Sequence, residues 1–61
     1  MAFDASRFMR VYSNLPLNLR NEVIVVLDDK PITWNAAYVE VAAKTKIGEL
    51  IVERLAHLGI I

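Results

Sequence analysis

The side chains best able to perform acid, base or nucleophilic chemistry are few and widely separated in this sequence. His57 is the only histidine, and it lies near the end of an expected helix, whereas Ser6 and Ser13 belong to a helix at the other end of the chain. A histidine at the negative end of a helix dipole is expected at the surface for structural reasons alone. We therefore expect no Ser-His-Asp catalytic site.

Two acidic pairs could act as general acids and bases or as metal ligands. The pair Asp28 and Asp29 is typical of a turn, and Glu49 and Glu53, one helical turn apart, are typical of a solvated helix face. The chain has no cysteine, one histidine and two glycines, which excludes a cysteine or histidine zinc site and a glycine-rich phosphate loop. We predict a non-enzymatic protein with no catalytic residues, no metal and no cofactor.

The composition predicts a small domain that works as an oligomer. The chain has 61 residues, of which 56% are hydrophobic, and a chain of this size buries only roughly 60% of the surface that it exposes when unfolded. One small core cannot hold so many apolar side chains, so we expect residues 1–61 to form a single domain that assembles as a homodimer and binds a protein partner.

Charge and hydropathy argue against two other classes of function. Seven basic and seven acidic side chains give a formal net charge of zero, which leaves no overall attraction to nucleic acid. The longest apolar run, VIVVL at residues 23–27, is far shorter than the ~20 residues that span a bilayer, and no signal-peptide pattern opens the chain. We expect a soluble cytoplasmic protein with no contact to a membrane.

Helix signals predict an all-α bundle of four short helices, at residues 4–14, 16–29, 33–44 and 46–58. Asp4 is a suitable N-cap for the first helix, with Phe3 and Phe8 as a hydrophobic staple. Thr33 and Thr45 are suitable caps for the third and fourth helices. Gly59 can form a left-handed cap after the last one.

The second segment, LPLNLRNEVIVVLDD, is compatible with two structures. Pro16 can begin a helix whose apolar stripe runs through Val23 and Leu27, but a β-branched run also suits a buried strand. A short β-hairpin at residues 22–34 is the alternative, with KPITW as the second strand across a turn at Asp28 and Asp29. We favour the helix, because KPITW is a weak partner and an unpaired strand leaves its backbone groups without hydrogen bonds.

The apolar periodicity of these helices also predicts the core. We expect it to include one stripe from each helix: Phe8, Val11, Tyr12, Leu15, Leu19, Val23, Leu27, Trp34, Tyr38, Val41, Ile47, Leu50, Ile51, Leu55 and Leu58.

Five residues are candidates for the subunit interface. Val39 and Val52 occupy similar positions beside the stripes of their helices, either as isolated surface valines or as lateral extensions into an interface. Arg54 falls inside the apolar stripe of the last helix, where an unpaired guanidinium is costly, so we predict that it pairs with Glu40, Asp28, Asp29 or a carboxylate of a second subunit. Ile60 and Ile61 complete the candidate set.

Two stretches resemble known families. Residues 39–61, VEVAAKTKIGELIVERLAHLGII, resemble the second and third helices of helix-turn-helix and winged-helix regulators, which implies DNA binding. The outer face of the last helix carries Glu49 and Glu53, which phosphates would repel. If DNA is bound, the candidate phosphate contacts are Arg7, Arg10, Arg20 and Lys46.

Residues 15–27 are similar to the LPxxLRxEV helix of small antitoxin-like proteins, through Leu15, Pro16, Leu19, Arg20, Glu22 and Val23. This resemblance supports a helix there. The chain as a whole resembles short uncharacterised helical proteins of prokaryotes, a resemblance that implies no activity. The interaction module is the function we expect, with a DNA-binding or antitoxin-like regulator as the alternative.

Overall fold

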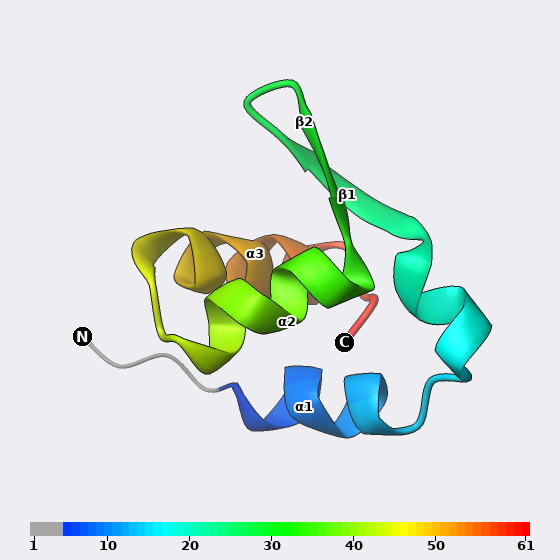
Figure 1. The fold of residues 1–61 in the computed structure, drawn as a ribbon. Helices are drawn as coiled ribbons and strands as arrows, with labels where there is room; N and C mark the ends of the chain where they lie inside the picture. The colour runs from blue at the N-terminus through cyan, green and yellow to red at the C-terminus, as the bar shows by residue number, and fades with distance from the viewer. Residues whose placement is uncertain (1–4) are drawn as a thin grey trace.

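The computed structural model describes residues 5–61 and shows a mixed α and β fold, so the prediction of an all-α four-helix bundle is wrong. Three helices pack together at one end of the molecule, and a two-stranded antiparallel hairpin rises from them (Figure 1). The elements in chain order are α1 (Ser6–Ser13), the 3₁₀ helix η1 (Leu17–Asn21), β1 (Val23–Leu27), β2 (Lys30–Thr33), α2 (Trp34–Ala42) and α3 (Lys46–His57).

The segment predicted as a helix at residues 16–29 is instead η1 followed by β1, and the alternative hairpin at residues 22–34 is confirmed. Pro16 has an extended ψ of 146° and separates α1 from η1. The hairpin turn consists of Asp28 and Asp29, whose φ angles are 50° and 64°. Positive φ at both central residues defines a type I′ turn, whose twist matches the twist of the paired strands and which aspartate tolerates.

The hairpin pairs Leu27 with Lys30, Val26 with Pro31 and Val25 with Ile32, and a bulge lies between Val23 and Val25. At its base, the Trp34 amide donates a hydrogen bond to the Glu22 carbonyl at 3.2 Å. These bonds supply the backbone partners that β1 needs. The second strand therefore satisfies the backbone groups of β1 despite its weak strand signal. The helix prediction was wrong because it assumed that this segment could not pair with β1.

The predicted helix ends of α2 and α3 are confirmed. The Thr33 hydroxyl accepts a hydrogen bond from the Ala36 amide at 3.1 Å, and the Thr45 hydroxyl accepts one from the Gly48 amide at 3.0 Å. After α3, Gly59 has a φ of 77°. The predicted cap of the first helix, Asp4, and its staple partner Phe3 lie outside the described residues.

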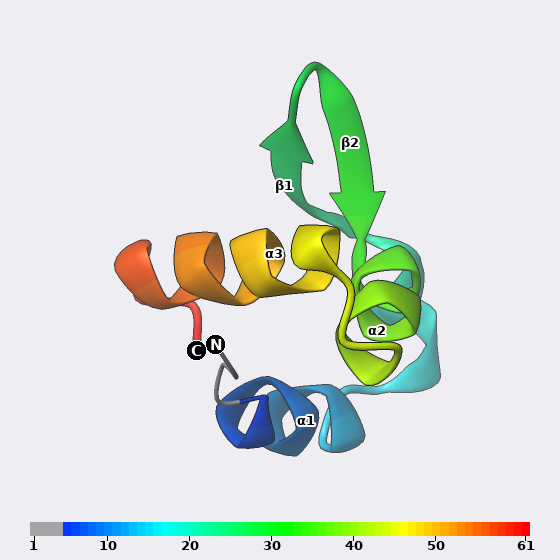
Figure 2. The ribbon, with the colours of Figure 1, turned by 90° about the vertical axis from the view of Figure 1, so that its left-hand side faces the viewer.

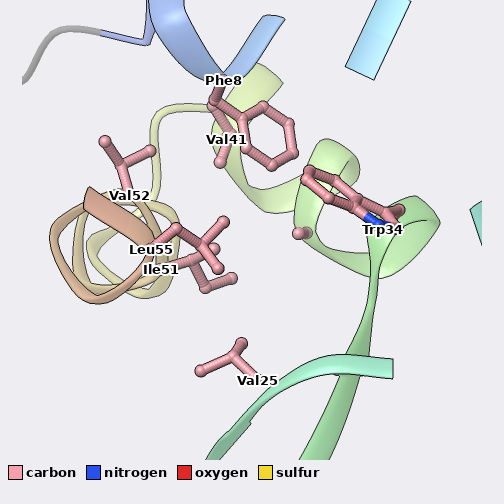
Figure 3. Close-up of a cluster of buried hydrophobic side chains, with 8 residues drawn as sticks. Phe8, Val25, Trp34, Val41, Ile51, Val52 and Leu55 are labelled. Carbon is pink, nitrogen blue, oxygen red and sulfur yellow. The ribbon is translucent and has the colours of Figure 1, made fainter. Parts of the chain in front are cut away.

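The core lies where α1, α2, α3 and β1 meet (Figure 3). Phe8, Trp34, Val41, Ile51 and Leu55 are buried as predicted, and Val11, Tyr12, Leu15 and Leu27 are partly buried against them. The prediction missed Val25, Ala37 and Val52, and it wrongly included six exposed side chains: Leu19, Val23, Tyr38, Ile47, Leu50 and Leu58.

Three of these six side chains are exposed for two reasons. Either the residue belongs to an element other than the predicted helix, or its helix has a second apolar face outside the core. Val23 belongs to a strand rather than to a helix stripe, while Ile47 and Leu50 lie on the side of α3 that faces the hairpin. Along the part of the chain that the structure describes, no helix is both long and apolar enough to cross a membrane.

Candidate functional site: a groove between the hairpin and α3

The residues with catalytic potential are not assembled into a site. Ser6 and Ser13 lie on α1, where the Ser13 hydroxyl donates a hydrogen bond to the Met9 carbonyl of its own helix at 2.7 Å. His57 is exposed at the end of α3. Within residues 5–61, no three histidine, cysteine, aspartate or glutamate side chains are grouped so that they could hold a metal ion.

Two of the four candidate phosphate contacts are engaged within the chain. The Arg7 guanidinium donates a hydrogen bond to the Ile61 carbonyl at 2.8 Å, which ties α1 to the end of the described chain. Arg20 donates to the Tyr12 carbonyl at 3.2 Å and lies 4.4 Å above the centre of the Tyr12 ring. The other two, Arg10 on α1 and Lys46 at the start of α3, are exposed but come from separate helices.

A polar and aromatic network that the sequence did not reveal connects α1 with η1 and α2. The Tyr12 ring stacks on Tyr38 with centroids 4.5 Å apart. Its hydroxyl donates to the Asn35 side chain at 2.8 Å, and Asn35 donates in turn to Asn21 at 2.9 Å. This network explains the half-exposed Tyr38 and the position of Arg20, and its role is to fix the elements relative to one another.

The candidate interface residues are distributed over different surfaces. Val52 is only 8% exposed and belongs to the core, so it cannot form the lateral extension considered with Val39, which is 62% exposed on α2. Ile61 is partly buried against the core. Ile60 is 40% exposed beyond the end of α3.

A groove with a volume of about 540 Å³ lies between the hairpin and one side of α3. Figure 2 shows the hairpin standing above α3, which runs beneath it. Three exposed apolar side chains contribute to the groove: Val26 from β1 and Ile47 and Leu50 from α3, at 55%, 50% and 46% exposure. The remaining lining residues are Leu27, Asp28, Lys30, Ile32, Glu53, Arg54 and His57.

The helical positions of α3 explain how one helix serves both the core and the groove. At 100° per residue, Ile51, Leu55 and Val52 follow the buried side, whereas Ile47, Leu50 and Arg54 are displaced toward the hairpin. Hence the wide apolar stripe is divided between two surfaces. Arg54 does not lie in the core, because it belongs to the exposed surface that lines the groove.

The predicted ion pair of Arg54 is not formed within residues 5–61. The guanidinium is exposed in the groove and makes no salt bridge with Glu40, Asp28 or Asp29. The Glu40 carboxylate instead accepts a hydrogen bond from the Thr45 hydroxyl at 2.6 Å. A positively charged group in a partly apolar groove therefore has no acidic partner in the described part of its own chain.

The comparisons with known proteins add no family to this description. The sequence matches no protein-family model, and no curated protein or solved structure matches it at a significant level. The function is therefore inferred from the groove and the residues that line it.

Proposed function

We propose that this chain is a non-enzymatic interaction module that binds protein through the groove between the hairpin and α3 and works as a small homo-oligomer. The observation that carries the proposal is the groove itself, where Val26, Ile47 and Leu50 stay about half exposed beside a recess. Exposed apolar side chains that cluster around a concavity, with charged groups at its rim, are typical of a binding surface.

The balance between core and surface supports the same proposal. Among residues 5–61, eight hydrophobic residues are buried, while ten large hydrophobic side chains remain exposed. Apolar side chains that the core cannot accommodate gain free energy when a partner covers them, at roughly 25 cal/mol per Å² of apolar surface. This is the physical reason to expect assembly.

The groove is a better docking site than either edge of the hairpin. Because Leu27 and Lys30 close a two-residue turn, they form a hydrogen-bonded pair, and the next pair, Val26 and Pro31, directs its backbone groups outward. Pro31 therefore removes a donor from the outer edge of β2, and the bulge between Val23 and Val25 interrupts β1. Both features oppose the addition of a further strand.

The groove can be tested with 1-anilinonaphthalene-8-sulfonate, a probe that combines apolar rings with an anionic group suited to Arg54. Titration of the ¹⁵N-labelled protein should shift the amide signals of groove residues such as Val26, Leu50 and Arg54. Leu50→Glu should weaken probe binding, because it places a charge in the apolar wall. Val39→Glu is the matched control, since Val39 is also apolar and exposed but lies on α2 outside the groove.

The two variants make the test decisive. Signal shifts confined to the groove, lost in Leu50→Glu and kept in Val39→Glu, would support the proposal. Shifts spread evenly over the surface, or lost equally in both variants, would overturn it.

A further inference from the structure

We infer that the occupant of the groove is the groove face of a second copy of this chain, with the two α3 helices antiparallel about a two-fold axis between Glu53 and Arg54. This inference rests on the proposed function, since it names the partner of the same surface. Its carrying observation is a pair of opposite charges, adjacent in sequence, that the described chain leaves without partners.

Glu53 and Arg54 both line the groove and are exposed, and neither forms an ion pair within residues 5–61. They cannot satisfy each other on one helix, because consecutive residues diverge by about 100° around the axis. In an isologous interface, every contact between one residue and another occurs twice. An axis between these two positions therefore sets Glu53 of each copy opposite Arg54 of the other.

The groove as a whole has the charge balance that self-association requires. Its lining contains the acids Asp28 and Glu53 and the bases Lys30 and Arg54, so the formal charge is −2 + 2 = 0 with His57 neutral. A face with a net charge would repel its own copy, whereas a balanced face does not. A strongly acidic partner would leave the two acidic side chains of the groove without opposite charges, and a strongly basic partner would do the same to the two basic side chains.

The same axis also brings the exposed apolar side chains of the groove into the interface. Ile47 lies near the start of α3, so in the antiparallel arrangement it lies beside the C-terminal end of α3 of the other copy. Leu50, about 5 Å from the axis along α3 at 1.5 Å per residue, lies opposite His57 of the other copy. Ile47 and Leu50 are 50% and 46% exposed in the single chain.

The position of the hairpin is compatible with this arrangement. The hairpin rises above α3 (Figure 2), and Arg54 and His57 of α3 are exposed and line the groove. The antiparallel helix of a second copy would then lie along the side of α3 that carries these residues, with the Val26 wall of each hairpin near the end of the other helix. Each copy would fill the other's groove, so the assembly would close at two subunits.

The decisive experiment is a charge-reversal mixture measured by sedimentation velocity and light scattering. The wild-type chain should be dimeric at about 1 mM and dissociate on dilution, as expected for a small interface. Arg54→Glu and Glu53→Arg should each weaken the dimer by on the order of tenfold or more, because both cross-subunit pairs become like charges. An equimolar mixture of the two variants should recover the dimer, since each glutamate then faces an arginine.

Both substituted positions are exposed, and circular dichroism of each variant checks that the fold is retained. Val39→Glu is the control and should leave the wild-type dimer unchanged. Recovery in the mixture, with neither variant dimeric alone, would support the inference, because a merely structural effect would not be cured by mixing.

A monomeric wild-type chain at 1 mM, or variants that dimerise as well as the wild type, would overturn the inference. So would a mixture that stays monomeric. These outcomes differ from failure of the groove as a binding site: a monomeric chain whose groove still binds the anilinonaphthalene probe would retain the groove as a docking site for another protein, and it would exclude both the second copy as occupant and the homo-oligomer of the proposed function.

Discussion

Replacing Gly48 with alanine should destabilise the protein, although alanine is the better helix former. Gly48 lies in the first turn of α3, where the helix passes the end of α2. A Cβ atom added there would lie 2.5 Å from the Glu40 carbonyl oxygen, 2.7 Å from the carbonyl carbon of the same residue and 3.0 Å from the Val41 Cα. All three are backbone atoms, so no side-chain rotation can relieve the overlap.

The magnitude follows from two opposing effects. Helix propensity favours alanine over glycine by about 1 kcal/mol. Relief of the overlap requires α2 and α3 to separate by roughly 1 Å to restore an ordinary contact. That movement would loosen the core to which both helices contribute, through residues such as Val41 and Ile51, and overpacking of this kind costs about 1–3 kcal/mol. Because the overlap is with rigid backbone, we expect the upper part of that range and a net loss of about 1–2 kcal/mol.

This loss is large for the chain. At about 0.05–0.15 kcal/mol per residue, its whole stability is on the order of 3–9 kcal/mol, and a loss of 1 kcal/mol lowers Tm by about 4–8 °C in a domain of this size. Urea unfolding followed by circular dichroism should show a lower midpoint with an unchanged slope. Unfolding should be measured at low micromolar protein concentration, where self-association would add no stability.

Glu53→Ala is the matched control for Gly48→Ala, because it also introduces alanine into α3 but at an exposed position. Its effect should stay within about 0.5 kcal/mol. A Gly48→Ala protein with the same or a higher Tm would show that propensity dominates, and it would refute the close crossing of α2 and α3.

Substitutions at three further positions test the local geometry. Lys44 has a φ of 57° at the end of α2, so Lys44→Gly should stabilise the protein by about 1 kcal/mol in thermal unfolding; a lower Tm would contradict this. Asp29→Gly should stabilise the type I′ turn by several tenths of a kcal/mol, seen as slower amide exchange in the hairpin, and faster exchange would argue against that turn. Thr45→Ala removes the acceptor of the Gly48 amide and should cost about 1 kcal/mol in urea unfolding, whereas Thr45→Ser, which keeps the hydroxyl, should recover most of it.

The features predicted correctly are those that a few neighbouring residues determine. Thr33 and Thr45 each bond an amide three residues later, and Gly59 ends α3 through bonds from Gly59 and Ile60 to Ala56 and Leu55. Such motifs act within one or two turns, so sequence spacing is enough to locate them. The same motif recurs at Lys44, where the sequence lacks the usual glycine.

The hairpin could not be assigned in the same way, because its strands depend on each other. The run VIVVL fits a helix stripe and a strand almost equally, and the choice is made by pairing with residues 30–33. One signal could have decided it: Asp28 and Asp29 are the only two residues between the strands, and aspartate is one of the few residue types that accept the positive φ of a type I′ turn. The weak strand signal of residues 30–33 was therefore the wrong criterion for choosing between the helix and the hairpin.

The groove was not predicted because the whole apolar stripe of the helix expected at residues 46–58 was assigned to the core. The sequence did mark Arg54 as anomalous, and the structure places it on the exposed surface of the groove, with no ion pair within residues 5–61. In a single chain the exposed guanidinium is solvated and costs little. Once an apolar surface covers the groove, that hydration is lost, and a buried charge is tolerated only when an acidic group compensates it. Arg54 therefore opposes any purely apolar occupant and favours one that supplies a carboxylate at its position, as Glu53 of a second copy would do.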